Sequence, residues 1–146
     1  TKIDGSSFVG KIPAYPRVYG KYQVNRVLQV GANLGSVAKE IDKGLDDNLR
    51  SLGPKHQVNI IVILTNILDP MYRHAVEDAW VGARKNDVVV FMGMEGTNIQ
   101  WVDVMTWALK SVNEIFTFTL RDKLLEMGEI KSEYVVTAIS EIMDKQ

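Results

Sequence analysis

A stripe of apolar residues at spacings of three and four predicts an amphipathic helix over residues 34–52. The residues of this stripe are Leu34, Val37, Ala38, Ile41, Leu45, Leu49 and Leu52. Charged side chains such as Asp42, Lys43 and Asp46 fall on the other side of the helix. The Gly53-Pro54 pair that follows is typical of a helix C-terminus, so we expect the helix to end there.

Two short apolar runs rich in β-branched residues flank a second predicted helix. The runs cover residues 56–65 and 87–94, and both have the length of a buried strand. Between them, Asp69-Pro70 supplies a cap and a first helical residue for a helix that reaches about residue 82. Strand, helix and strand in this order indicate a right-handed parallel crossover. Residues 95–98 then form a tight turn, and the alternating segment 99–107 returns as a strand.

The two ends of the chain have less regular patterns. Residues 1–23 carry glycines and prolines without a lasting period, so we expect an irregular lead-in, part of which packs on the domain. Residues 24–30 fit either a short strand or a helical turn. Residues 114–120 fit a further short strand, residues 120–127 fit a helix, and residues 132–145 fit a helix with one apolar face.

The order of these elements predicts an α/β fold. We expect a single compact three-layer α/β/α domain over residues 24–146, with a central mixed sheet built on a β-α-β-β core and helices on both faces. The length of 146 residues is that of one domain, and no internal repeat divides it.

Composition excludes several classes of function. Hydrophobic residues make up 46% of the chain and charged residues 24%, and the formal net charge of −1 gives no bulk attraction to nucleic acid. The chain has no cysteine, which excludes disulfides, thiolate zinc sites and cysteine nucleophiles. Its two histidines, His56 and His74, are too few for a three-histidine metal site. The sequence also lacks glycine-rich phosphate loops and a hydrolase nucleophile elbow.

Polar side chains follow both buried strands at the points where the strands end. Asn66 and Asp69 come after the first strand, and Glu95 comes after the second. Open α/β sheets bind ligands outside the carboxyl ends of their strands, and oxygen donors suit Ca²⁺ or Mg²⁺. Asp69 and Glu95 are therefore candidate metal ligands, with Asn66 as a further candidate. The alternative is that Asn66 and Asp69 serve the turn and the helix cap, and that Glu95 begins the hairpin.

A second polar pair lies within the predicted helix that follows Asp69. His74 and Asp78 are four residues apart on one helix face, so they could ligate a metal or act as an acid–base pair. The plainer interpretation is a solvated helix face. Trp80 and Trp101 lie at helix and strand spacing, and we expect both in the core.

The segment from the second helix into the second buried strand resembles the TPM domain family, named for its thylakoid lumen, photosystem II repair and acetylcholine-receptor-modulating founders. That family typically shows a helix with Trp and Gly, a polar loop with Asn, and a buried hydrophobic strand. The residues that match this order are Trp80, Gly82, Lys85, Asn86 and Val88-Val89-Val90. As a pattern of elements, the likeness extends over roughly residues 28–143.

The resemblance implies a location and a first kind of function. Members of the family tend to lie outside the cytoplasm and to be tethered by a membrane segment. The Thr1 start leads us to expect such a segment beyond these 146 residues. We therefore expect an extracytoplasmic, membrane-tethered domain that acts in protein interaction or in the maintenance of a membrane protein complex, and that binds no nucleic acid.

The alternative that the resemblance implies is a divalent-metal-dependent phosphatase. In that function, Asp69 and Glu95 hold a Ca²⁺ or Mg²⁺ ion, and a bound water attacks phosphorus. The family's polar loop adds Asn86 and Asp87 as secondary candidates. By the predicted topology these two residues lie at the opposite strand end from Asp69 and Glu95.

Overall fold

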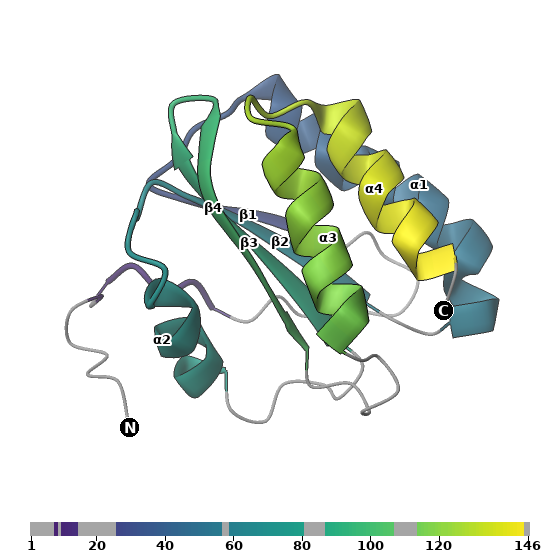
Figure 1. The fold of residues 1–146 in the computed structure, drawn as a ribbon, viewed down its shortest axis with the longest axis horizontal. Helices are drawn as coiled ribbons and strands as arrows, with labels where there is room; N and C mark the ends of the chain where they lie inside the picture. Colours follow the sequence, from purple (N-terminus) through teal and green to yellow (C-terminus); the bar gives the residue numbers. More distant parts are fainter. Residues whose placement is uncertain are drawn as a thin grey trace.

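Four strands and four helices make up the described part of the chain in a computed structural model, which covers residues 8, 10–14, 26–56, 59–80, 87–106 and 114–144 (Figure 1). In chain order they are β1 Val27–Val30, α1 Ser36–His56, β2 Asn59–Thr65, α2 Tyr72–Ala79, β3 Asp87–Glu95, β4 Asn98–Thr106, α3 Glu114–Glu126 and α4 Ser132–Asp144. The segment 24–30, which fits a strand or a helical turn by sequence, therefore contains a strand.

The described strands form one sheet in the order β1-β2-β3-β4. β1, β2 and β3 run parallel and β4 runs antiparallel to β3, so the sheet is mixed, as predicted. A tight turn at Gly96 and Thr97 joins β3 to β4. Gly96 has a φ of 62°, a left-handed conformation that glycine adopts without strain. The predicted α/β class and the hairpin are thereby confirmed.

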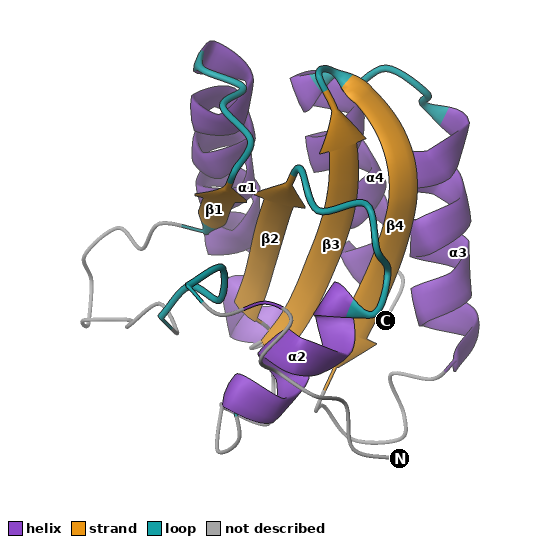
Figure 2. Cartoon of the chain, turned by 90° about the vertical axis from the view of Figure 1, so that its left-hand side faces the viewer, coloured by secondary structure: helices purple, strands orange, loops and turns teal. Residues whose placement is uncertain are grey.

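Alternate side chains of each central strand belong to two separate cores. In β2, Ile60, Val62 and Leu64 pack with α1, α3 and α4, whereas Ile61 and Ile63 pack with α2. All five side chains are fully buried because helices cover both faces of the sheet. Figure 2 shows α2 in front of the sheet and the other three helices behind it. The uninterrupted apolar run in the sequence reflects this two-sided burial.

The two parallel crossovers have opposite hands. α1 and α2 lie on opposite faces, yet the strand order advances from β1 through β2 to β3 without reversing. In Figure 2 these three strands point upward and follow one another from left to right, with α2 in front and α1 behind. The β2-α2-β3 connection is therefore right-handed, as predicted. The β1-α1-β2 connection is left-handed, which is rare among parallel crossovers.

Two expectations about helices need correction. α1 does not end at the Gly53-Pro54 pair but continues through it to His56. A proline in the last turn removes one backbone hydrogen bond, and the preceding turns of this long helix keep the helical path. The segment 114–120, for which a short strand is one alternative, is the first half of α3. Burial of Leu120 and Leu124 in the core overrides the strand propensity of its threonines and aromatic residues.

Part of the N-terminal lead-in packs on α2, as its apolar side chains suggest. The Tyr72 hydroxyl group donates a hydrogen bond of 2.5 Å to the carbonyl of Lys11, and the Trp80 indole N–H donates one of 2.9 Å to the carbonyl of Pro13. Phe8 is buried and meets the Tyr72 ring edge-on, with the ring centroids 5.4 Å apart. Within residues 1–25, the described part of the chain comprises residues 8 and 10–14.

A buried charged cluster joins the entrance of β1 to α1. The backbone N–H of Arg26 donates a hydrogen bond of 3.0 Å to Asp42 Oδ1, and Arg26 Nε lies 3.8 Å from Asp46 Oδ1. Burial lowers the pKa of Arg26, and the two carboxylates oppose that effect. Burial likewise raises the pKa of Asp42 above its usual value. These contacts hold Arg26, the residue before β1, against α1.

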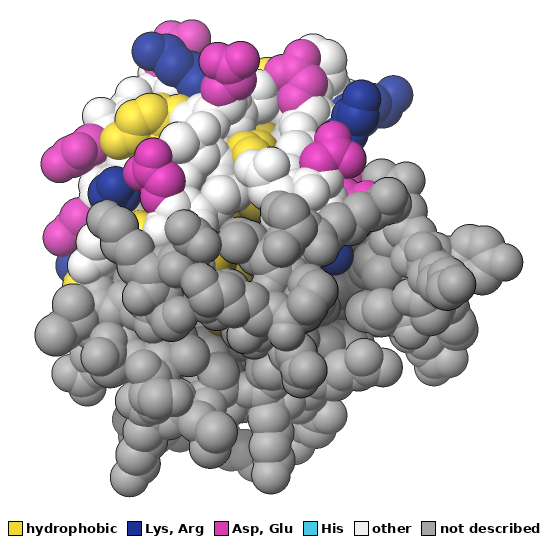
Figure 3. All heavy atoms as spheres, turned by 90° about the vertical axis from the view of Figure 1, so that its right-hand side faces the viewer, with side chains coloured by type: hydrophobic (Ala, Val, Ile, Leu, Met, Phe, Trp, Pro, Cys, Tyr) yellow, Lys and Arg dark blue, Asp and Glu magenta, His cyan; other side chains and the backbone are white. Residues whose placement is uncertain are grey.

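The outer surface over α1 and α4 is mixed in charge. Figure 3 shows acidic side chains interspersed with Lys and Arg over the described part of this side of the molecule. This mixture agrees with the formal net charge of −1. Within the described segments, no helix combines the length and the apolar character that crossing a membrane requires.

Candidate functional site

A cleft of about 370 Å³ opens at the edge of the sheet where β1, β2 and β3 end. Its walls are the loop after β1, the residue that follows β2, and the β3–β4 hairpin. The lining residues are Gly31, Ala32, Asn33, Leu34, Asn66, Met94, Gly96 and Thr97. Open α/β sheets bind ligands at this position, so the cleft is the candidate site.

Gly31 and Asn66 are in direct contact at this edge. Gly31 has a φ of 75° and forms an isolated bridge with Thr65, while the backbone N–H of Asn66 donates a hydrogen bond of 3.2 Å to the carbonyl of Val30. The Asn66 amide lies so close to Gly31 that a Cβ at position 31 would overlap it. Glycine is therefore required here both by the backbone conformation and by the space available.

The segment that follows Asn66 is held by two hydrogen bonds. The indole N–H of Trp101 donates a bond of 3.0 Å to the carbonyl of Ile67, and the backbone N–H of Ile67 donates one of 3.1 Å to Thr65 Oγ1. The Trp101 ring fills the space beside Gly93, where a Cβ would overlap it. Because Thr65 and Trp101 are themselves buried, these bonds fix the chain just beyond the cleft.

The other two walls are also tied to their neighbours. In the hairpin, the carbonyl of Thr97 accepts a hydrogen bond of 2.8 Å from Ile130, and the N–H of Ile99 donates one of 2.7 Å to the carbonyl of Gly128. In the loop after β1, the N–H of Leu34 donates one of 2.7 Å to Gln29 Oε1. The cleft is therefore pre-formed, and binding there requires little rearrangement.

The described lining of the cleft combines polar and apolar side chains, and none of these residues is charged. It offers the amides of Asn33 and Asn66, the hydroxyl group of Thr97, and the apolar side chains of Leu34 and Met94. Side-chain amides both donate and accept hydrogen bonds, so they pair with peptide groups and other neutral polar groups. The chemistry of the cleft suits a neutral polar ligand with an apolar part.

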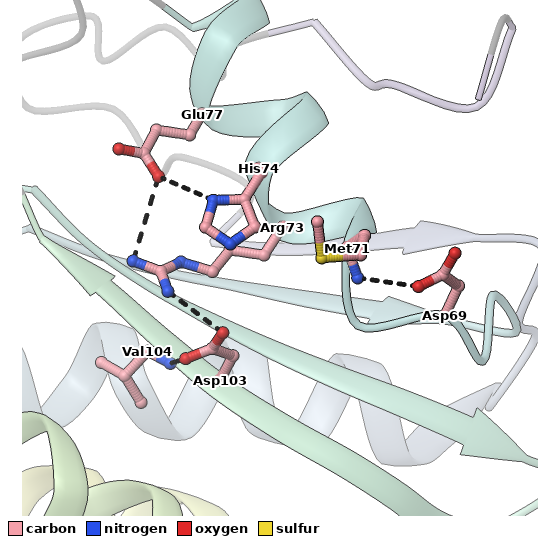
Figure 4. A network of polar contacts seen from close by, with 7 residues as sticks. All are labelled: Asp69, Met71, Arg73, His74, Glu77, Asp103 and Val104. Carbon is pink, nitrogen blue, oxygen red and sulfur yellow. Dashed lines mark hydrogen bonds and ion pairs between the residues drawn. The ribbon is translucent and has the colours of Figure 1, made fainter. Parts of the chain in front are cut away.

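Among the described sequence candidates, Asn66 lines the cleft, whereas Asp69 and Glu95 do not. Glu95 is the last residue of β3, is exposed, and pairs with Asn98 across the hairpin. Asp69 lies before α2, where its Oδ1 accepts a hydrogen bond of 3.0 Å from the backbone N–H of Met71 (Figure 4). Glu95 thus lies at the start of the hairpin and Asp69 at the turn before α2, as in the alternative interpretation of the sequence.

The secondary candidates fall elsewhere. Asp87 is the first residue of β3, and Asn86 lies outside the described residues. Since β3 runs parallel to β2, Asp87 pairs with Asn59 at the amino ends of these strands, whereas Asn66 follows the carboxyl end of β2. This separation agrees with the topology expected from the sequence.

The described residues contain no group of three or more His, Asp or Glu side chains that could hold a metal ion. Ca²⁺ takes about six to eight oxygen ligands, with carboxylates prominent among them. One oxygen of Asp69 is engaged by Met71, and the lining of the cleft contributes neutral donors only. These donors fit a hard divalent ion poorly, and the Ca²⁺ or Mg²⁺ site stays a prediction.

The polar face of α2 forms contacts that sequence spacing does not reveal. His74 Nδ1 lies 3.9 Å from Glu77 Oε2, which is too far for a hydrogen bond, and Asp78 is exposed. Arg73 Nη1 donates a hydrogen bond of 3.2 Å to Asp103 Oδ2 on β4 (Figure 4). The solvated helix face is therefore the better interpretation of His74, and Arg73 forms a polar contact between α2 and β4.

Several residues that line or support the cleft escape sequence reasoning. Gly31 and Asn33 follow a strand of four residues that pattern alone does not identify, and Trp101 is expected only as a core residue. The available signal is the run Gly-Ala-Asn-Leu-Gly at residues 31–35, whose glycines and asparagine are typical of a turn after a strand.

Comparisons with known proteins bear on the fold alone. No protein-family model matches the chain, and no curated protein matches it. Among solved structures, the chain is similar to the solution NMR structure of the N-terminal domain of the cg2496 protein from Corynebacterium glutamicum. The TM-score is 0.52 at 13% sequence identity, over 90% of this chain and 82% of that chain. This likeness supports the α/β architecture and names no family.

Proposed function

We propose that this domain is a protein-binding module that recognises an exposed peptide segment of its partner through the cleft at the carboxyl ends of β1, β2 and β3. The observation that carries the proposal is the pre-formed, uncharged lining, in which the amides of Asn33 and Asn66 accompany the apolar side chain of Leu34. The amides match the donors and acceptors of a peptide backbone, and an apolar contact selects a side chain.

Two exposed apolar side chains support recognition of a protein. Leu68 and Met71 are each 47% exposed and lie between Asn66 and α2. The hydrogen bond from Trp101 to Ile67 already orders the start of this segment, so binding loses little conformational entropy there. Apolar side chains held in this way beside a polar cleft resemble the anchors of protein interfaces.

The TPM resemblance extends the proposal to a partner and a location. In this proposal the chain is a divergent TPM-type domain, tethered by a membrane segment outside these 146 residues and facing away from the cytoplasm. Its partner is then a component of a membrane protein complex. The peptide segment recognised by the cleft belongs to that component.

A divalent-metal-dependent phosphatase is the competing function. It requires Asp69 and Glu95 around one ion, whereas one carboxylate caps the turn before α2 and the other ends β3. Thermal melting in millimolar CaCl₂ or MgCl₂, together with hydrolysis of p-nitrophenyl phosphate, separates the two functions. Metal-dependent turnover that Asp69→Asn abolishes would establish the enzyme. An unchanged melting temperature without turnover would leave the binding function.

A peptide selection tests the binding function directly. Peptides selected from a random library on the immobilised domain are measured by calorimetry against wild type, Asn66→Ala and Gln100→Ala. Loss of one hydrogen bond from the cleft weakens binding about two- to tenfold in Asn66→Ala. Gln100→Ala removes the same amide from an exposed position of β4 outside the cleft and leaves the affinity unchanged. The proposal fails if no peptide is enriched or if both variants bind equally.

A further inference from the structure

A second cavity, of about 300 Å³, lies at the outer edge of β4 between α2 on one face of the sheet and α3 on the other. The residues that line it are Arg73, Asp103, Val104, Thr117, Phe118 and Arg121. None of them lines the cleft at the carboxyl ends of β1, β2 and β3. The cavity is therefore a separate place on the molecule, and it differs from the cleft in being lined by charged side chains.

Asp103 holds Arg73 in one orientation. Asp103 Oδ2 accepts the hydrogen bond of 3.2 Å from Arg73 Nη1, and Oδ1 accepts one of 2.9 Å from the backbone N–H of Val104 (Figure 4). The second carboxylate near Arg73, that of Glu77, lies 3.9 Å from Nη2, beyond hydrogen-bonding distance. Arg73 Nε is buried and makes no hydrogen bond within the described part of the chain.

Arg121 brings a second guanidinium to the same cavity from α3. Its guanidinium carbon lies 4.9 Å from the centroid of the Phe118 ring, and Phe118 is 50% exposed. Its contacts with Asp122, the next residue, measure 3.3 and 3.4 Å, and the Asp122 side chain is 64% exposed. An exposed ion pair of this kind is weak, so Arg121 remains available to a stronger anionic partner.

The balance of charge in the cavity selects the ligand. Arg73 and Arg121 face one carboxylate, that of Asp103, whose two oxygens are both engaged within the protein. Among the described lining residues this leaves two guanidiniums to one carboxylate beside the exposed ring of Phe118. The carboxylates of Glu77, 3.9 Å from Arg73, and of Asp122, 3.3 Å from Arg121, lie outside the lining. A planar guanidinium matches the two oxygens of a carboxylate, and the nearby carboxylates of Glu77 and Asp122 disfavour a ligand with more negative charge, such as a phosphate dianion.

We propose that this cavity binds a carboxylate that carries an apolar stem, with Arg121 as its principal cation, Arg73 beside it, and Phe118 against the stem. Two sources supply this chemistry, a free organic acid and the C-terminus of a peptide with a large apolar last residue. Phenylacetate represents the first source and acetyl-alanyl-phenylalanine the second. Phenylacetamide has nearly the same shape without the charge, and inorganic phosphate has charge without the stem.

Titrations followed by amide chemical shifts test the proposal on the wild-type chain. We expect saturable shifts at Val104, Phe118 and Arg121 with phenylacetate, and none with phenylacetamide. If the peptide acid binds about tenfold more tightly than phenylacetate, the source of the carboxylate is a chain terminus. If it binds equally or more weakly, the source is a free acid. Absence of saturable shifts with phenylacetate, equal shifts with phenylacetamide, or tighter binding of phosphate would overturn the proposal.

A pair of charge-removing variants locates the site. Arg121→Gln removes the principal cation from an exposed helix position, and phenylacetate binding is expected to weaken about tenfold or more. Lys131→Gln removes one positive charge from an exposed position that does not line the cavity, and binding is expected to stay as in wild type. Equal affinities for the two variants would show that the shifts report nonspecific attraction and would overturn the proposal.

Discussion

The indole N–H of Trp101 lies 3.0 Å from the carbonyl oxygen of Ile67, a residue 34 positions earlier in the chain. The hydrogen bond joins β4 to the segment that leaves β2 beside the cleft. The segment that contains Asn66, Ile67 and Leu68 is therefore shaped by the hairpin as well as by its own sequence. This bond therefore couples the packing of Trp101 in the core to the segment beside the cleft.

Replacing Trp101 with Phe tests this coupling. The variant keeps an aromatic ring in the core and leaves the Ile67 carbonyl without its donor, so the free energy of unfolding falls by about 1–3 kcal/mol. Urea denaturation measures the loss, and hydrogen exchange at residues 66–69 is expected to become faster. Trp80→Phe is the matched control, because it removes the bond to Pro13 instead. Equal acceleration at 66–69 in both variants would contradict the coupling.

Gly31→Ala tests the contact with Asn66. Alanine in a left-handed conformation is strained by about 1–2 kcal/mol, and its Cβ also overlaps the Asn66 amide. Gly35 has a φ of 55° with open space around it, so Gly35→Ala isolates the conformational strain. We expect Gly31→Ala to lower the free energy of unfolding by roughly 1 kcal/mol more than Gly35→Ala does. Adding Asn66→Ala should recover part of that difference, and equal losses in the two glycine variants would count against the contact.

Stability at alkaline pH tests the packing of the lead-in on α2. Burial raises the pKa of Tyr72 to about 12, so the folded state keeps a proton that the unfolded chain releases near pH 10. The contribution of Tyr72 is complete below about pH 10 and is lost as the pH rises towards 12. Tyr72→Phe should be less stable than wild type at about pH 8, by about 1 kcal/mol, with the difference shrinking above about pH 10.

The exposed Tyr134 supplies the control for that measurement, since Tyr134→Phe removes a hydroxyl group from a side chain on the surface of α4. Its stability relative to wild type is expected to change little over the same pH range. A constant difference between Tyr72→Phe and wild type from pH 8 upwards would contradict the burial of the Tyr72 hydroxyl group.

Asp42→Asn tests the charged cluster at the entrance of β1. Burial raises the pKa of Asp42, so the folded state binds its proton more tightly than the unfolded chain does. The contribution of Asp42 to stability is therefore largest below its usual pKa and declines as the pH rises through the raised value. Asparagine keeps an acceptor for Arg26 and does not titrate. The free energy of unfolding of Asp42→Asn, relative to wild type, should thus rise with pH from about 3 to about 6.

Asp47→Asn is the control for this pH series, because Asp47 is exposed on the same helix. Chemical denaturation at several pH values gives the comparison. A relative stability of Asp42→Asn that falls with rising pH would contradict the account of a carboxylate whose pKa is raised by burial.

The parts of the fold that the sequence predicts are those with a local physical signature. Ile60 to Leu64 and Val88 to Met92 form unbroken apolar runs because helices bury both sides of β2 and β3. β1 has intermediate burial at the edge of the sheet, so its four residues give no such run. The left-handed crossover through α1 could not be predicted, because an apolar stripe on a helix does not say which face of the sheet it covers.

The candidate site was predictable to the same extent. The rule that ligands bind beyond strand ends selects the edge of the sheet at which the cleft lies, and Asn66 lines that cleft. The rule does not say where a side chain points, and the local bond to Met71 holds Asp69 at the start of α2. Arg73 and Arg121 come together only through the packing of two helices around β4, which no spacing in the sequence encodes.

The most direct test of the binding function is a map of amide chemical shifts in the domain as a selected peptide is added. The account predicts that the largest shifts fall at residues 31–34, at Asn66 and at residues 94–97, the three walls of the cleft. Asn66→Ala should reduce those shifts at the same peptide concentration. Shifts concentrated on α2, α3 or α4, with the three walls unchanged, would contradict it.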